Sequence, residues 1–325
     1  MTAARSEAGK TTVAPAPWAA AHALGASAPE LAAFQDEPPQ MRSGTAGKTG
    51  FLRIGFERPG DRTILANIDR RAPYMVQRAL YCDQEMPGLA CVFLINTTGC
   101  VVQGDRLALD IMVGPRAQAH VTTQSATKIH TMDANYAAQT QTITLADDAY
   151  LEFLPDPVIP HRRARFLSDT RISIAPTATI LFSEIIQPGR RHHRPDECFG
   201  ATVMSISTAG ARPCGRPLFV EKLVIEPQRY PVRQTGVMDS FEVFGNVILC
   251  APKDKTDRIF ERVEADVDPA LGLAFGPCRL PNDAGLIYKV LGRETTQVKA
   301  KVREFWGVVR EEVIGVGLPA PFLWR

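Results

Sequence analysis

The sequence predicts a mainly β protein: a β-helical or solenoid-like body of many short strands, followed by a smaller α+β part at the C-terminal end. From Gly50 to about residue 250, short runs of alternating apolar and polar residues follow one another. Gly, Pro, Asp and Asn separate these runs, and no convincing helical pattern lies between them. Residues 251–325 change to helical periodicity.

Residues 1–45 differ from the rest of the chain in composition. They are rich in Ala, Pro, Ser and Gly and contain few large apolar side chains. Such a segment buries too little apolar surface to offset the entropy lost on ordering, so we expect a mobile extension. The sequence thus predicts an extension over residues 1–45, a β-rich body over 46–250 and a C-terminal part over 251–325.

Three segments of the predicted body resemble one another at a spacing of about 30 residues: VGPRAQAHVTTQ (113–124), LADDAYLEFLPD (145–156) and IAPTATILFSEI (174–185). Each carries alanine at its fifth position and an apolar residue at its ninth. Repeats of this length are typical of stacked, solenoid-like units. A meander whose turns happen to be similar explains the pattern equally well.

Two amphipathic helices are predicted in the C-terminal part. In KDKTDRIFERVEADV, Ile259, Val263 and Val267 recur four residues apart beside charged neighbours. In ETTQVKAKVREFWGVVREEVIG, one face carries Val298, Val302, Phe305, Val309 and Val313. This spacing indicates helices that pack one apolar face. The strand-like runs LGLAF and GLIYKVL lie between them.

Charge and cysteine content exclude several classes of function. The chain has 37 basic and 35 acidic residues, a formal net charge of +2, so neither nucleic acid nor an anionic membrane is an expected partner. Its seven cysteines form no C-x-x-C pair, which is typical of reduced cytosolic thiols. No stretch has the apolar length of a membrane span. We expect a soluble, cytoplasmic protein.

The stretch TTQSATKIH (122–130) contains Ser125-x-x-Lys128, the spacing of serine–lysine hydrolases. That chemistry needs a helix that places the lysine one turn beneath the serine. Here the preceding residues alternate with strand periodicity, and residues three apart in a strand face opposite sides. The pattern therefore does not favour a catalytic serine.

Other polar clusters allow two interpretations each. His192 and His193 in RRHHRPDEC could bind nickel, copper or zinc, but the neighbouring arginines favour a solvated basic loop. Asp105, in the glycine-containing turn NTTGCVVQGDRL, is either functional or a cap of backbone amides.

Acidic residues also interrupt apolar strands, at Glu152, Glu184 and Glu221. Each either faces water or lies inward, where it needs a partner or a wet cavity. No two acids have the fixed spacing of a general acid and base, so we predict no catalytic residue.

Eight segments, read in order, resemble the family of the urease accessory protein UreD, also called UreH. They are RTILA (62–66), PYMVQRALY (73–81), NTTGCVVQGDRL, TTQSATKIH, YLEFLPDPVI (150–159), SEIIQPGR (183–190), PLFVEKL (217–223) and the closing LPAPFLWR. The resemblance covers roughly residues 50–325.

The resemblance implies a non-enzymatic scaffold or chaperone with a β-helical body. Such a protein binds the urease apoenzyme, recruits UreF and, through UreF, the GTPase UreG, and helps deliver nickel to the urease active site. It implies no tightly bound cofactor, only transient nickel. Carried over by motif, the residues expected along a nickel passage are Asp105, Glu184 and Glu221, with Thr127 and Lys128 as weaker candidates.

Three positions depart from the family pattern. Cys100 and Gln103 stand where glycine is usual, which puts the shape of the turn before Asp105 in question. His130 stands where an aromatic residue is common, and is either a structural histidine or a residue close to nickel. Two rival functions stay open: a purely structural adaptor without a nickel passage, and a β-helical carbohydrate-active enzyme with clustered carboxylates.

Overall fold

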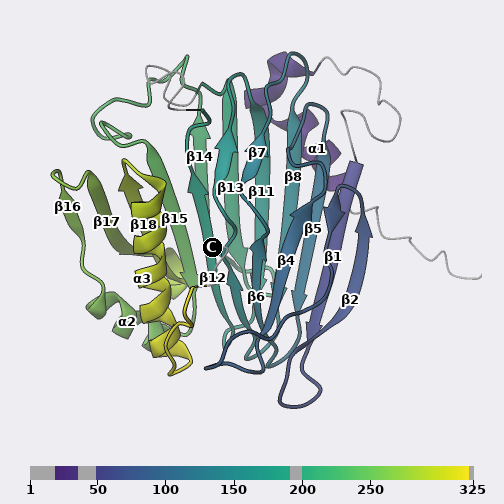
Figure 1. Cartoon of the computed structure of the whole chain (residues 1–325), viewed down its shortest axis with the longest axis vertical. Helices are drawn as coiled ribbons and strands as arrows, with labels where there is room; N and C mark the ends of the chain where they lie inside the picture. Colours follow the sequence, from purple (N-terminus) through teal and green to yellow (C-terminus); the bar gives the residue numbers. More distant parts are fainter. Residues whose placement is uncertain (1–18, 36–48, 191–199, 322–325) are drawn as a thin grey trace, which may run out of the picture.

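The computed structural model describes residues 19–35, 49–190 and 200–321 (Figure 1). Over these residues the chain is mainly β, as predicted, and no helix lies between Thr49 and Cys250. The described strands form a seven-stranded sheet in the order β14-β13-β11-β8-β5-β1-β2 and an eleven-stranded sheet that includes β16-β17-β18-β15-β12-β9-β6-β4-β3. Apolar side chains from both sheets form one core between them, among them Ile54, Ile111, Val121, Leu151 and Ile180.

The strand bounds are as follows. The seven-stranded sheet contains β1 (Thr49–Glu57), β2 (Ile64–Arg71), β5 (Arg106–Val113), β8 (Ala137–Leu145), β11 (Arg165–Ile174), β13 (Val203–Ala211) and β14 (Pro217–Ile225). The other contains β3 (Tyr74–Met75), β4 (Ala90–Asn96), β6 (Gln118–Thr123), β9 (Tyr150–Phe153), β12 (Thr179–Ile186), β15 (Val243–Cys250), β16 (Asp266–Asp268), β17 (Leu273–Arg279) and β18 (Gly285–Gly292). The short strands β7 (Thr127–Ile129) and β10 (Val158–Pro160) pair with each other, and β10 also pairs with β12.

From β4 to β13 the main strands alternate between the two sheets, and sheet neighbours run parallel. The three similar sequence segments lie side by side in this arrangement, because Gln118 pairs with Tyr150 and Tyr150 with Thr179. The alanine at the fifth position of each segment immediately precedes one of these residues and is buried: Ala117, Ala149 and Ala178. The sequence repeat therefore marks equivalent positions on stacked parallel strands.

The C-terminal part adds antiparallel strands and two helices at one end of the molecule (Figure 1). Helix α3 (Thr295–Val313) packs on β15 and β18 through Val298, Val302, Phe305 and Val309, as its periodicity predicts. Its first turn is closed by a reciprocal capping box between Glu294 and Gln297.

Helix α2 is shorter than its sequence pattern suggested. It spans Lys253–Arg262, and the chain is extended at Val263. Val267, expected on the helical stripe, lies instead in β16 and is 65% exposed. Beyond the end of the helix, Val263 still packs against the core of the C-terminal part, whereas Val267 does not.

Part of the expected mobile extension has regular structure. Helix α1 (Ala19–Ser27) and the 3₁₀ turn η1 (Pro29–Phe34) pack against the face of the seven-stranded sheet that is turned away from the other sheet. Leu31 is fully buried there, and a Cβ atom at Gly25 would lie 2.2 Å from a ring carbon of Tyr136. Glu30 accepts hydrogen bonds from Ser205 and Lys222. Small residues thus allow a close approach that a count of large apolar side chains misses. The boundaries at residues 45 and 250 stay predictions.

Candidate functional site

Two rows of polar side chains face each other between the sheets. In the eleven-stranded sheet, Glu184 on β12 pairs with Asn246 on β15, and Asn246 pairs with Lys289 on β18. In the seven-stranded sheet, Thr208 on β13 pairs with Glu221 on β14. Directly paired residues project from the same face of a sheet. The rows meet because Glu184, Thr208, Glu221 and Asn246 line one small cavity of ≈10 Å³.

The polar atoms of this small cavity are incompletely satisfied. Asn246 and Thr208 are only 5% and 2% exposed, yet Asn246 Oδ1 and Thr208 Oγ1 have no hydrogen-bond partner among the described residues. Burial, together with the neighbouring Glu221 carboxylate, raises the pKa of Glu184 to about 7. Near neutral pH, Glu184 therefore exchanges readily between neutral and charged forms. This oxygen-rich set suits a cation that binds and leaves.

Glu184 also lines a larger cavity of ≈110 Å³ between the sheets. Gln139, Gln141 and Ser168 line its seven-stranded side, and Gln141 donates a hydrogen bond to Thr170 Oγ1 (2.9 Å). Thr127 and Lys128, on β7, line the same cavity. The structure thus brings three of the five predicted passage residues, Thr127, Lys128 and Glu184, to one cavity, and Glu221 to the cavity adjoining it.

A third cavity, of ≈300 Å³, lies beside α3. It shares Pro155, Asp156 and Ile185 with the cavity between the sheets. The three cavities are therefore consecutive. The cavity beside α3 adjoins the cavity between the sheets at Asp156. The cavity between the sheets adjoins the small cavity at Glu184.

Asp105 lies at a different kind of position. Its side chain is fully buried, and its Oδ2 accepts a hydrogen bond from the Val102 amide (3.0 Å). Asp105 does not line the three cavities, but it lies near Tyr74, which lines the cavity between the sheets. Burial, with a further contribution from Asp105, raises the pKa of the Tyr74 hydroxyl. Asp105 therefore shapes the turn behind the cavity wall.

The turn before Asp105 keeps an allowed backbone at both departures from the family pattern. Left-handed φ values fall on Gly99 (+70°) and Gly104 (+79°), and not on Cys100 or Gln103. The glycines that remain are those the turn requires.

His130 does not line the three cavities, whereas Ser125 and Lys128 line the cavity between the sheets together with Glu184. His130 is exposed and its ring lies 5.8 Å from that of His161. His192 and His193 lie outside the described residues. Within the described ranges, no group of three or more His, Cys, Asp or Glu side chains is arranged to hold a metal ion. Ser125 and Lys128 are both exposed, on a turn and on β7, with no helix joining them.

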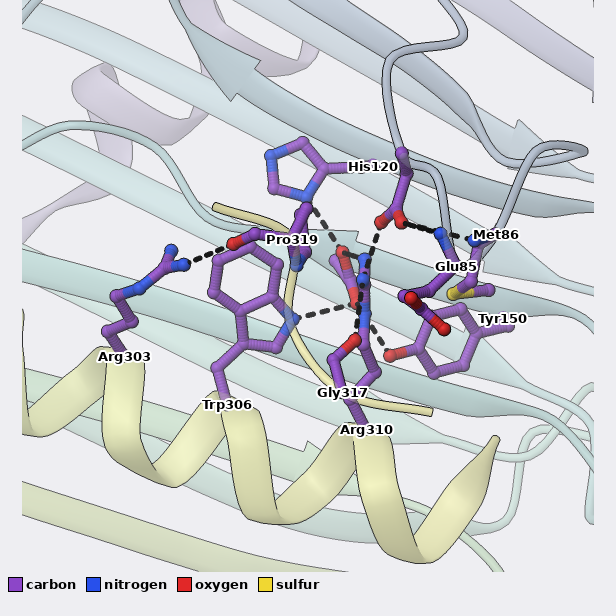
Figure 2. A network of polar contacts seen from close by, with 11 residues as sticks. Glu85, Met86, His120, Tyr150, Arg303, Trp306, Arg310, Gly317 and Pro319 are labelled. Atoms are coloured by element: carbon purple, nitrogen blue, oxygen red, sulfur yellow. Dashed lines mark hydrogen bonds and ion pairs between the residues drawn. The ribbon is translucent and has the colours of Figure 1, made fainter. Parts of the chain in front are cut away.

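Glu152 faces inward and fastens α3 to the β body. Figure 2 shows Trp306 and Arg310 of α3 extending toward the strands that carry His120 and Tyr150. Its fully buried carboxylate accepts five hydrogen bonds, from Tyr150 Oη (2.7 Å), His120 Nδ1 (2.8 Å), Trp306 Nε1 (2.7 Å), Arg310 Nε (2.9 Å) and Arg310 Nη2 (3.1 Å). Burial alone would raise the pKa of Glu152, but the hydrogen bonds from His120 and Arg310 lower it to about 2. Glu152 is therefore structural.

Sequence reasoning left the orientation of Glu152 open and did not single out Arg310. Arg310 is 1% exposed and also pairs with Asp83. Trp306 and Arg310 are four residues apart on α3, so they share a helix face. The four-residue spacing of Trp306 and Arg310, beside the apolar stripe of α3, is the feature of the sequence that could have predicted a buried arginine.

Comparison with known proteins addresses the resemblance directly. The family model described as "UreD urease accessory protein" matches residues 48–325. The chain belongs to the UreD family. It is 56% identical over 305 residues to the "Urease accessory protein UreD" of Photorhabdus laumondii subsp. laumondii, covering 94% of this chain and 95% of that protein. The protein of the same description from Yersinia pseudotuberculosis is 54% identical over 305 residues, with the same coverage. "Urease accessory protein UreD 2" of Brucella suis is 50% identical over 295 residues, covering 91% of this chain and 98% of the relative.

Membership in the UreD family confirms the resemblance predicted from the eight segments. The helix α1 and turn η1 precede the residues that the UreD family model matches. In the described part of this UreD family member, no helix has the length and apolar character to cross a membrane.

Proposed function

We propose that this UreD family member is a non-enzymatic, cytoplasmic urease accessory protein through which nickel moves toward urease. In this proposal it binds the urease apoenzyme, recruits UreF and, through UreF, the GTPase UreG. The observation that carries the proposal is the meeting of Glu184 and Glu221 in one small cavity, beside two buried oxygen atoms that have no hydrogen-bond partner among the described residues. The names of its relatives supply the client, urease.

The chemistry of the cavities fits a cargo ion better than a resident one. Carboxylate, amide and hydroxyl oxygens bind a borderline dication such as nickel more loosely than thiolate and imidazole sets do. A carboxyl group whose pKa lies near 7, as that of Glu184 does, costs little free energy to discharge when the ion moves on. We assign Glu184 and Glu221 to the transient binding of nickel, and propose no tightly bound cofactor.

The remaining candidates are assigned by position. Thr127 and Lys128, on β7, line the cavity between the sheets together with Glu184, and we propose that they border the passage there. Asp105 is assigned to holding the turn that forms part of the wall, through its bond to the Val102 amide.

We further propose that the body is β-helical. Strands β4 to β13 visit the two sheets alternately and stack in parallel, so a rigid wall surrounds the cavity between them. Such a wall keeps polar positions in fixed register along the passage.

The rival functions differ in what they require of the cavities. A carbohydrate-active enzyme needs a cleft that holds a sugar between its two acids, whereas Glu184 and Glu221 share a cavity of only ≈10 Å³. A purely structural adaptor needs only docking surfaces. Exposed apolar residues such as Val220, Val224 and Tyr230, on and after β14, fit the docking surface of an adaptor. They fit equally well the docking surface of a protein that also passes nickel to its partner.

The test of the proposed function is urease maturation in cells. Urease subunits and the other accessory proteins are produced with and without this chain, and nickel per active site is counted in purified urease. We expect nickel-loaded, active urease only when this chain is present. Equal loading without it would overturn the proposed function.

A further inference from the structure

Lys289 occupies the outer end of the row that contains Glu184 and Asn246. Its ammonium group binds Glu221 Oε1 across the space between the two sheets. The same nitrogen lies 5.8 Å from the centre of the Phe244 ring, which lines the small cavity. The Lys289 ammonium therefore caps the small cavity at its Glu221 side.

The lysine is placed so that it can leave this position. Its side chain is 47% exposed, whereas that of Glu221 is 29% exposed. A lysine carries its charge on a flexible four-carbon stem, so the ammonium group can turn away from Glu221 into solvent. The carboxylate, fixed in β14 opposite Thr208, has less freedom.

We propose that Lys289 is a tethered cation. It holds Glu221 when no metal ion is bound, and a divalent ion must displace it in order to bind. The inference rests on the proposed passage and adds a rule for what enters it. A dication gains about twice the Coulomb attraction of a monovalent ion at the same distance from Glu221 and Glu184. It can therefore replace the ammonium group, whereas sodium or potassium gains too little. Lys289 acts as a specificity-determining residue that excludes monovalent cations.

The unpartnered oxygens support this assignment independently of Glu221. Asn246 Oδ1 and Thr208 Oγ1 are buried beside Glu184 and lack hydrogen-bond partners in the described structure, although the Lys289 ammonium binds Glu221 close by. An ion at this position would satisfy those acceptors together with the carboxylates, which the ammonium group does not do.

The test is titration of the purified full chain with Ni²⁺ by isothermal calorimetry, comparing wild type with Lys289→Met and Lys289→Arg. Methionine keeps the apolar stem and removes the competing charge, so we expect about three- to tenfold tighter binding of Ni²⁺. Arginine keeps the charge and should bind Ni²⁺ no more tightly than wild type. Excess sodium chloride should weaken Ni²⁺ binding more in the methionine variant than in wild type.

Lys253→Met is the matched control. Lys253 forms exposed ion pairs with Asp257 and Asp283, away from the cavities, so its variant should titrate like wild type. Glu221→Gln separates failure of the proposed nickel passage from failure of the proposed role of Lys289. If wild type binds Ni²⁺, Glu221→Gln weakens binding and Lys289→Met equals wild type within about twofold, the role of Lys289 is refuted while the passage stands. If Ni²⁺ binds none of these chains, or binds Glu221→Gln as it binds wild type, the passage and the lysine's role both fall.

Discussion

Replacing Glu152 with alanine is expected to lower the free energy of unfolding by about 3–5 kcal/mol. The substitution removes all five hydrogen bonds on the carboxylate and leaves Arg310, which is 1% exposed, with one carboxylate partner, Asp83. The buried charge of Arg310 is then only partly compensated, and Tyr150 and Trp306 lose the acceptor of their buried donors, both of which are costly in the interior. Urea unfolding followed by circular dichroism and tryptophan fluorescence measures the change.

The matched control lies on α3, the helix to which Glu152 binds. Glu304 is 62% exposed and pairs with Lys301 in an i,i+3 arrangement, so Glu304→Ala should change stability by no more than about 0.5 kcal/mol. Since Glu152 lies at the junction of α3 and the body, the Glu152 variant should also free α3 for proteolysis before the β body unfolds. Equal, small effects of the two substitutions would show that the buried ion pair does not hold α3.

Replacing both Glu184 and Glu221 with glutamine is expected to lower nickel per urease active site by about tenfold or more. Glutamine keeps the size and hydrogen-bonding capacity of each side chain and removes the negative charge that attracts a dication. Neither residue forms part of the Glu152 network, so the chain should stay folded and still assemble with its partners. Nickel is counted by mass spectrometry in urease matured with each variant.

Glu264→Gln is the control for this pair, because Glu264 is exposed in the loop after α2 and lies outside the cavities. It should support wild-type nickel loading. Full loading with the double variant, in a complex of normal composition, would favour the structural adaptor over the passage.

The motifs singled out Glu184 and Glu221 but did not predict how the two side chains are arranged. Period-two alternation in SEIIQPGR and PLFVEKL placed Glu184 and Glu221 in strands, yet left open which way each side chain points. That they face each other depends on β12 and β14 belonging to opposite sheets, a long-range pairing that no local pattern contains. Lys289 was missed for the same reason, since it reaches Glu221 only through the β15–β18 pairing.

Two other differences have causes of their own. The ordered α1–η1 segment depends on close contact between Gly25 and Tyr136, 111 residues further along the chain, which composition cannot reveal. The helix predicted to run to Val267 ends at Arg262, because the extended backbone at Val263 begins the path into β16. In contrast, the apolar stripe of α3 was fully readable, since four consecutive contacts follow helical spacing.

Closing the cavity between the sheets tests the passage most directly. Ser168 on β11 is 3% exposed and lines that ≈110 Å³ cavity, so Ser168→Leu fills the space without altering a carboxylate. Ser168→Ala, which leaves the space open, is its control. Nickel per active site is measured in urease matured with each variant, after the assembled complex has been verified. The passage predicts nickel-poor urease with leucine and fully loaded urease with alanine. Full loading with leucine would contradict movement of nickel through this chain.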